Sequence, residues 1–328
     1  MAAFAAAISL VAVVGGTAFA ALPGEGSSWN TEIAGGSPIY AAQGYQEARD
    51  NNGNVAQVWV EGDDTIHIAY NNGEPRGWSG ALTGWAPRII WTQWGFRVFH
   101  TGLDNHVYYA GFQVNADGSL NLGTWQQIPG NVVTNQPVGV SGLNGSRQEE
   151  WMLAWRGMDG RVYAQYHLRD NYALVWATPV AITNAVSNYG PAVAYDPTHG
   201  IITTVWTGTD GNEYSADQPY GQPYWQFYRQ QGSEYGRATG APAASYEING
   251  RGYISISESI SHNIDIMEMC NIYEPSCTTY SQPESTNYTT PQAPALSTDG
   301  YNIYIEAGSP YTLWVWKPLR DNSGAPPQ

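Results

Sequence analysis

Residues 154–163 read Ala-Trp-Arg-Gly-Met-Asp-Gly-Arg-Val-Tyr, a pattern typical of a strand, a tight turn and a second strand. Apolar and aromatic residues occupy both ends, and Gly and Asp occupy the middle, where turn-type dihedrals are needed. The pattern returns at residues 99–108 and 205–214, and weaker copies occur at residues 58–66, 257–264 and 305–314. Six hairpins of one design predict a repeat protein.

A proline precedes the first predicted strand of each repeat, and the intervals between these prolines are 49, 50, 54, 51 and 52 residues. The prolines are Pro38, Pro87, Pro137, Pro191, Pro242 and Pro294. A tryptophan marks a fourth strand in four of the repeats, namely Trp78, Trp125, Trp176 and Trp225. Because about 50 residues with four short strands make a propeller blade, we predict an all-β, six-bladed β-propeller whose blades start near these prolines.

The sixth repeat lacks its fourth strand, and the N-terminal residues 24–34 are the candidate replacement. Trp29 lies nine residues before Pro38, as Trp78 lies nine before Pro87. We expect this strand to complete the last blade and close the ring, because closure removes exposed sheet edges. The propeller is then one domain over residues 21–320, followed by a disordered tail at 321–328. The turns that hold Asp64, Asp104, Asp159 and Asp210 are expected on the same face as the loops between blades.

The N-terminal residues 1–20 are apolar and end in Ala18-Phe19-Ala20, a small-x-small cleavage pattern. They predict a secretory signal peptide, with a membrane anchor as the alternative. The protein is therefore expected to be secreted and extracellular. Cys270 and Cys277 then predict a disulfide that closes a small loop, two free thiols being the alternative.

The composition argues against several classes of partner. The net charge is −15, only 12% of the residues are charged, and 13% are aromatic. An acidic surface repels phosphate backbones and anionic lipid, so we expect neither nucleic acid binding nor membrane insertion. The sequence contains no phosphate loop and no zinc-protease motif, and we predict no cofactor and no metal.

The repeated turns have both a structural and a functional interpretation. Their aspartates can cap the turn, or they can point polar atoms into a groove between blades. The tryptophans at equivalent positions can pack blade against blade, or they can stack on a sugar ring. On the functional interpretation, the ligand-binding residues are Trp59, Asp104, Trp155, Arg156, Asp159, Trp206 and Asp210. No catalytic residue is assigned.

The repeated hairpin resembles bacterial β-propeller lectins of the Photorhabdus type and their tectonin-like relatives. Their repeats read Arg-Gly-x-Asp-x-x-Val/Leu-Tyr/Trp before a Trp strand, and residues 154–163 and 99–108 fit this pattern. The resemblance implies secreted, multivalent binding of fucosylated or O-methylated glycans between blades, without chemistry. Those lectins are seven-bladed, however. Fungal fucose-binding lectins are six-bladed, and Phe96-Arg97-Val98-Phe99 looks like their Arg-bearing strand, but their Arg/Glu/Trp triplet is not repeated here.

Two other classes of function remain open. A glycoside hydrolase of the sialidase or arabinanase kind, or a lyase, would need one central pocket lined by unrepeated Asp, Glu and Arg. The Ser-x-Asp-x-Gly-x-x-Trp box of sialidases does not appear in the sequence. A protein-interaction scaffold would need a broad exposed apolar face. The sequence leaves open the sugar, the number of sites and the oligomeric state. It also leaves open whether the protein is an enzyme, although it favours a binding protein over an enzyme.

Overall fold

The computed structural model describes the parts of the chain that form strands and the turns between many of them. The described residues are 29–30, 43–71, 73–92, 94–143, 151–170, 173–197, 199–219, 226–231, 238–246, 252–258, 264–270, 280–284, 295–296, 303–307 and 312–316. They contain strands and no helix, in agreement with the all-β prediction. Within these ranges, no helix has the length and hydropathy needed to cross a bilayer.

The described strands form six antiparallel sheets, each of four strands in its main path. The first sheet contains β2 (Gln43–Arg49), β3 (Val55–Val60), β4 (Thr65–Tyr70) and β5 (Arg76–Leu82). The second contains β6 (Arg88–Thr92), β7 (Gly95–Thr101), β8 (Val107–Val114) and β10 (Gln126–Gln127), with β9 (Leu120–Leu122) also paired to β8. The third contains β11 (Gly139–Gly142), β12 (Trp151–Arg156), β13 (Arg161–Asp170) and β14 (Ala173–Trp176), with β15 (Val180–Val186) also paired to β13.

The remaining sheets follow the same order along the chain, except at the last. The fourth sheet contains β16 (Ala192–Asp196), β17 (Ile201–Thr207), β18 (Glu213–Pro219) and β19 (Gln226–Gln231). The fifth contains β20 (Ala243–Tyr246), β21 (Gly252–Glu258), β22 (Ile264–Cys270) and β23 (Tyr280–Glu284). The sixth contains β24 (Ala295–Leu296), β25 (Ile303–Ala307), β26 (Thr312–Trp316) and the N-terminal β1 (Trp29–Asn30), which pairs with β26.

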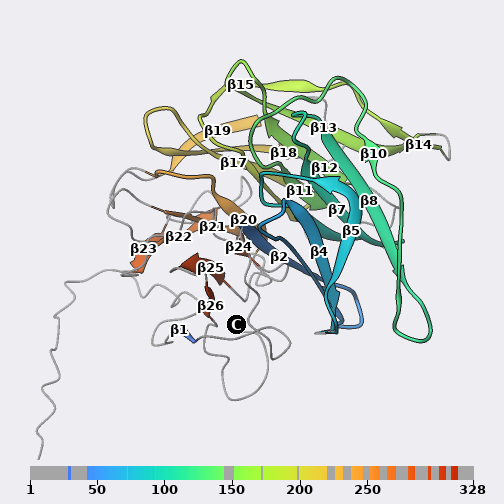
Figure 1. The fold of residues 1–328 in the computed structure, drawn as a ribbon. Helices are drawn as coiled ribbons and strands as arrows, with labels where there is room; N and C mark the ends of the chain where they lie inside the picture. Colours follow the sequence, from blue (N-terminus) through green and yellow to red (C-terminus); the bar gives the residue numbers. More distant parts are fainter. Residues whose placement is uncertain are drawn as a thin grey trace, which may run out of the picture.

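The sheets are arranged around a common centre, where their first strands lie side by side (Figure 1). In chain order, each of these first strands contacts the next, and the last of them contacts β2; they are β2, β6, β11, β16, β20 and β24. This cyclic arrangement of antiparallel sheets is that of a β-propeller.

The proline and tryptophan markers agree with the strands. Four of the six prolines directly precede or lie two residues before a first strand, whereas Pro38 and Pro294 lie outside the described residues. Trp78 lies in β5, Trp176 ends β14 and Trp125 directly precedes β10, whereas Trp225 is outside the described part. Residues 1–20, residues 321–328 and Cys277 are also outside it, so the predicted signal peptide, tail and disulfide remain predictions.

The loops between sheets lie on the same face as the repeated turns, as predicted. The backbone N–H of Thr83 donates to the carbonyl of Asp64, and that of Ser187 donates to Gly160. The corresponding bonds join Thr134 to Asn105 and Ala238 to Gly211. Each loop is thus tied to the turn of the sheet that it leaves.

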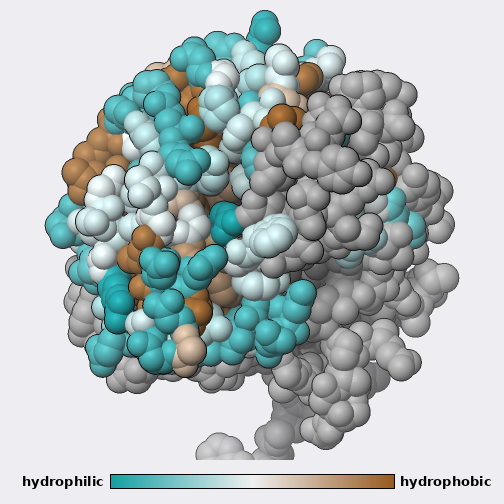
Figure 2. Space-filling view, turned by 90° about the vertical axis from the view of Figure 1, so that its right-hand side faces the viewer, coloured by the Kyte–Doolittle hydropathy of each residue, from teal (hydrophilic) through white to brown (hydrophobic). Residues whose placement is uncertain are grey.

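Neighbouring sheets bury apolar side chains against each other. Ala56, Trp78 and Phe96 belong to a cluster between the first and second sheets, whereas Met152 and Ile202 belong to one between the third and fourth. Away from these clusters, the coloured part of the face in Figure 2 is mostly hydrophilic, with hydrophobic residues in small separate groups.

Candidate functional site

The repeated turns are locked by their aspartates. The Oδ1 atom of Asp159 accepts the backbone N–H of Arg161 at 3.1 Å, and its Oδ2 accepts the hydroxyl of Tyr163 at 2.9 Å. Asp104 and Asp210 make the same pair of bonds, the first with His106 and Tyr108 and the second with Asn212 and Tyr214. Although partial burial opposes it, these bonds hold the pKa of the Asp159 carboxyl below its ordinary value.

The turn glycines have a different role from the one that the sequence indicated. Gly157 is not in the left-handed region; a Cβ there would lie 2.8 Å from Asp159 Oδ1 and 2.7 Å from the Tyr163 ring. The left-handed residue follows the aspartate instead, and it is Gly160 in this turn and Asp64 in the first sheet. Asp63, rather than Asp64, therefore occupies the capping position, and it accepts the N–H of Thr65 at 3.0 Å.

The predicted tryptophans are buried inside the propeller, and the predicted arginine is half-buried. Trp59, Trp155 and Trp206 have exposed fractions of 2%, 4% and 1%. Each ring stacks on an aromatic residue of the next strand, as Trp155 does on Tyr163 at a centroid separation of 5.6 Å and an interplanar angle of 18°. Arg156 donates from Nε to the carbonyl of Ser187 at 2.8 Å and from Nη1 to Oδ1 of Asn135 at 3.0 Å. These groups therefore hold turn and loop together, and their role in binding is still a prediction.

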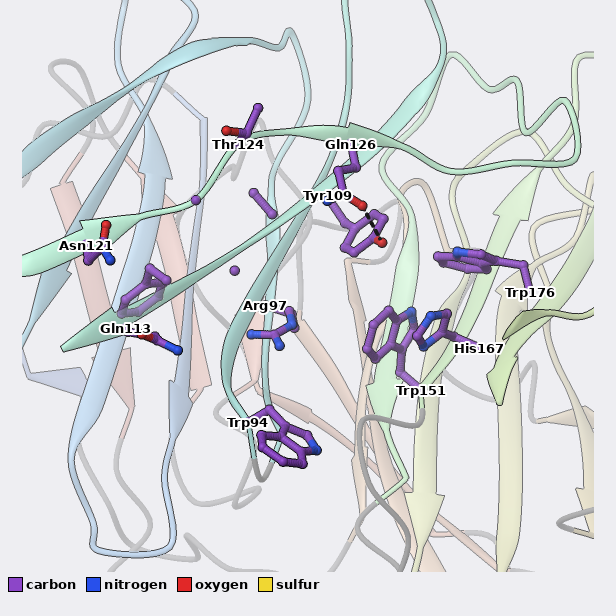
Figure 3. A pocket seen from close by; sticks show the side chains of 14 residues that line it. Trp94, Arg97, Tyr109, Gln113, Asn121, Thr124, Gln126, Trp151, His167 and Trp176 are labelled. Atoms are coloured by element: carbon purple, nitrogen blue, oxygen red, sulfur yellow. Dashed lines mark hydrogen bonds between the residues drawn. The ribbon is translucent and has the colours of Figure 1, made fainter. Parts of the chain in front are cut away.

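A cavity of about 600 Å³ opens between the second and third sheets (Figure 3). One wall comes from β7, β8 and β10, which supply Arg97, Tyr109 and Gln126. The other wall comes from β12, β13 and β14, which supply Trp151, His167 and Trp176. Trp94, which is 51% exposed, also lines the cavity.

The space for this cavity is created by Gly111, the cross-strand partner of Arg97. A Cβ at Gly111 would lie 2.5 Å from Nη1 of Arg97, so the guanidinium packs directly over the glycine. The corresponding pairs in the first, third and fourth sheets are Ala56–Tyr70, Met152–Tyr166 and Thr203–Asp217. Among these four sheets, only the second has a cationic side chain paired with a glycine, Arg97 with Gly111.

The side chains around the cavity are held by defined contacts. The hydroxyl of Tyr109 donates to Oε1 of Gln126 at 2.8 Å, drawn as a dashed line in Figure 3. The Trp151 and His167 rings stack with centroids 3.9 Å apart and an interplanar angle of 14°, and Trp176 lies 4.8 Å from His167. The Nη1 atom of Arg97 donates to the carbonyl of Phe96 at 3.1 Å. The three rings of the aromatic wall therefore pack against one another, and Trp176 is the one that is not fully buried.

Arg97 is the one charged side chain among the described residues that line the cavity. Burial, with a smaller contribution from Arg97, lowers the pKa of His167 to about 4. His167 is therefore neutral at pH 7, whereas the guanidinium remains charged. The described residues that line the cavity include neither Asp nor Glu. No group of three or more metal-ligating side chains occurs in the described ranges.

The sequence singled out some residues of this cavity, but it did not predict that they lie together. The stretch Phe96-Arg97-Val98-Phe99 was recognised as an Arg-bearing strand, and Trp176 as a fourth-strand marker, but neither residue was predicted to bind a ligand. The missing signal was Gly111, because only the register of the sheet shows that it faces Arg97. Trp151 and His167 come from another sheet, which sequence spacing alone does not place opposite Arg97.

Comparisons with known proteins support the propeller fold. No family model and no curated protein matches the chain. The solved structure of AofleA from Arthrobotrys oligospora has a TM-score of 0.58 and 12% identity, covering 89% of this chain and 88% of that one. SapL1 lectin in complex with alpha methyl fucoside has a TM-score of 0.56 and 13% identity, covering 87% and 98%.

A variant of the Aleuria aurantia lectin in complex with Fucalpha1-6GlcNAc is also similar, with a TM-score of 0.55 and 12% identity over 87% of this chain and 94% of that one. At these identities, the likeness shows a shared fold, the β-propeller, and no more. The similar structures include fucose-binding lectins, the class whose Arg-bearing strand residues 96–99 resemble, whereas the resemblance to the Photorhabdus type remains a prediction.

Proposed function

We propose that the chain is a secreted lectin, a carbohydrate-binding protein without chemistry of its own. In this proposal it is a six-bladed ring whose last blade is completed by the N-terminal strand, and it binds glycans in grooves between blades. The observation that carries the proposal is the cavity between the second and third sheets, where a cation and an aromatic wall face each other. The shared fold with lectins that bind fucosides gives it further support.

The cavity has the properties of a sugar site. Its volume of about 600 Å³ falls within the range of roughly 300–1,000 Å³ that is usual for ligand pockets. Sugar rings present C–H groups that pack on aromatic faces, which Trp94 and Trp176 supply, and hydroxyl groups that need polar partners. The polar side chains that line the cavity include Arg97, Gln113, Asn121, Thr124 and Gln126.

The number of sites per chain is a separate part of the proposal. The groove between the first and second sheets contains Trp78, Phe96 and Phe112, all 2% exposed, in place of a cation. The groove between the third and fourth sheets contains the buried side chains of Met152 and Ile202. Because these two interfaces are filled by apolar side chains, we propose that any repeated sites lie between the other blades. The combined avidity of several sites would exceed that of one site.

A calorimetric titration with fucose, galactose, sialic acid and O-methylated sugars tests the proposal, together with a fluorogenic glycosidase screen. We expect binding heat and no turnover. Heat from none of the sugars would contradict the lectin proposal, and turnover would favour the glycosidase alternative.

Two variants then locate the site. Gly111→Tyr places in the second sheet the residue that the first and third sheets carry there, and it should abolish binding while the melting temperature stays close to that of the parent. Trp155→Phe alters a predicted turn residue, and we expect it to change the affinity less than twofold. If Trp155→Phe abolished binding and Gly111→Tyr did not, the binding site would lie at the repeated turns instead of in the cavity.

A further inference from the structure

We infer that the cavity between the second and third sheets recognises an oligosaccharide of two or more linked sugar units, rather than one terminal sugar. The inference rests on the proposed function, and it assigns the second unit to the amide side chains of Gln113 and Asn121, which line the cavity. Three observations carry it: the size of the cavity, the separation of its aromatic and amide ends, and the fixed geometry of the hairpin that bears the amides.

The cavity is larger than one sugar needs. Its volume is about 600 Å³. A single pyranose occupies on the order of 200 Å³ at the packing density of organic crystals. A monosaccharide that packed on one aromatic ring would therefore leave most of the lining side chains in contact with water. A chain of about two or three linked rings matches the space better.

The lining side chains differ between the two ends of the cavity (Figure 3). Trp176 of β14 lies at one end and is half-buried, whereas Gln113 and Asn121 lie at the other end and are exposed. The ring of Tyr109, 5.7 Å from that of Trp176, belongs to the same strand as Gln113. From residue 109 to residue 113 the chain advances about 13 Å, at about 3.3 Å per strand residue. One pyranose ring cannot reach both ends.

The two amides face the cavity from one side of the second sheet. Side chains alternate along a strand, so Tyr109, Gly111 and Gln113 share a face of β8. Asn121 of β9 is the cross-strand partner of Gln113, and its side chain therefore lies on that face as well. Each amide can both donate and accept a hydrogen bond, as sugar hydroxyls do. The pair is thus suited to the hydroxyl groups of a second sugar unit.

The hairpin that joins β8 to β9 holds this pair in place. The backbone N–H of Asn115 donates to the carbonyl of Ser119 at 2.8 Å, and Oδ1 of Asp117 accepts the N–H of Ser119 at 2.9 Å. Gly118 has the left-handed conformation that this turn requires, with a φ of 81°. Because the strands are already ordered, less conformational entropy is lost when a second sugar unit binds.

The test is a calorimetric titration of the full chain with pairs of ligands that share a terminal sugar. The pairs are methyl fucoside with Fucalpha1-6GlcNAc, methyl galactoside with lactose, and methyl glucoside with cellotriose. We expect at least one of the longer sugars to bind about tenfold more tightly than its methyl glycoside, the gain that one or two added hydrogen bonds would give.

Single variants assign the gain to the amide end of the cavity. Gln113→Ala and Asn121→Ala should each reduce the affinity ratio between the longer sugar and its methyl glycoside by about fivefold. Gln127→Ala is the matched control and should leave the ratio unchanged, because Gln127 is an exposed glutamine of the same sheet that does not line the cavity.

The outcomes separate the inference from the proposed function. If every methyl glycoside bound as tightly as its longer partner, the inference would be overturned and the lectin proposal would stand. A gain that persisted in both amide variants would also overturn the inference. Binding of none of the sugars would overturn the lectin proposal itself.

Discussion

His100 occupies the position at which the first, third and fourth sheets carry Trp59, Trp155 and Trp206. It stacks on Tyr108 at 5.4 Å and meets Trp125 edge-on at 4.6 Å. The side chain is 3% exposed, and neither ring nitrogen has a hydrogen-bond partner. Burial lowers the pKa of His100 to about 4, although the backbone of Thr101 and the carboxylate of Asp104 oppose the shift.

This residue makes the stability of the fold depend on pH. The unfolded chain binds a proton at His100 below about pH 6.5, whereas the folded protein binds it only near pH 4. The free energy of unfolding should therefore fall as the pH is lowered from 6.5 to 4, by about 3 kcal/mol at about 1.4 kcal/mol per pKa unit.

Replacement of His100 by phenylalanine should remove that part of the pH dependence, because no protonatable group remains in the buried position. Urea unfolding at several pH values between 7 and 4 measures it. The parent protein, measured under the same conditions, is the reference for the slope. An unchanged slope in His100→Phe would contradict the assignment.

The loops between sheets act at the scale of the element. Thr83, which is fully buried, donates from its hydroxyl to the carbonyl of Thr101 in the next sheet at 2.6 Å and accepts the N–H of Trp85 at 3.0 Å. Ser187 repeats the arrangement with Thr207 and Tyr189. One hydroxyl thus joins the end of one sheet to the second strand of the following sheet.

We expect Thr83→Val to lower the free energy of unfolding by about 2 kcal/mol, because a buried carbonyl and a half-buried N–H lose their partner. Thr204→Val is the matched control. The Thr204 hydroxyl is buried and has no partner, so its removal should cost less than about 0.5 kcal/mol or stabilise the protein. Chemical unfolding of both variants gives the comparison, and equal effects would refute the proposed contribution of the loop.

At this scale the sequence predicted the regular features and missed the exceptions. Proline spacing and the Gly-x-Asp turns located the first strands and the hairpins, because both reflect local backbone geometry. The division of the fourth strand into β9 and β10, and into β14 and β15, was not predicted, since it depends on pairing with β8 and β13. Local pattern predicts turns better than it predicts which of two strands extends a sheet.

At the scale of the whole molecule, the fold was easier to predict than the candidate site. Six similar repeats favour a ring because each can bury its apolar faces only against neighbours. The cavity arises where one repeat departs from the others, at Arg97 and Gly111, and where two sheets meet. The turns are the feature that the repeats share, whereas the cavity depends on a side chain that one repeat lacks, at Gly111.

The last sheet offers a test of how the ring is completed. Trp29 and Asn30 of β1 pair with Trp316 and Val315 of β26, which joins the two ends of the chain. If the N-terminal strand closes the propeller, deletion of residues 24–34 leaves the edge of β26 exposed, and exposed edges promote association. We expect the shortened protein to melt at a lower temperature and to aggregate.

A synthetic peptide of residues 24–34 should restore the melting temperature when it is added to the shortened protein, because binding to the folded state stabilises it by mass action. The control is deletion of residues 321–328, which follow β26 and should be dispensable. Calorimetric melting and size-exclusion chromatography measure both effects. If the deletion of residues 24–34 changed neither quantity, the last blade would have to be complete without β1. If the peptide failed to rescue a destabilised protein, the N-terminal residues would be stabilising it by some means other than strand pairing.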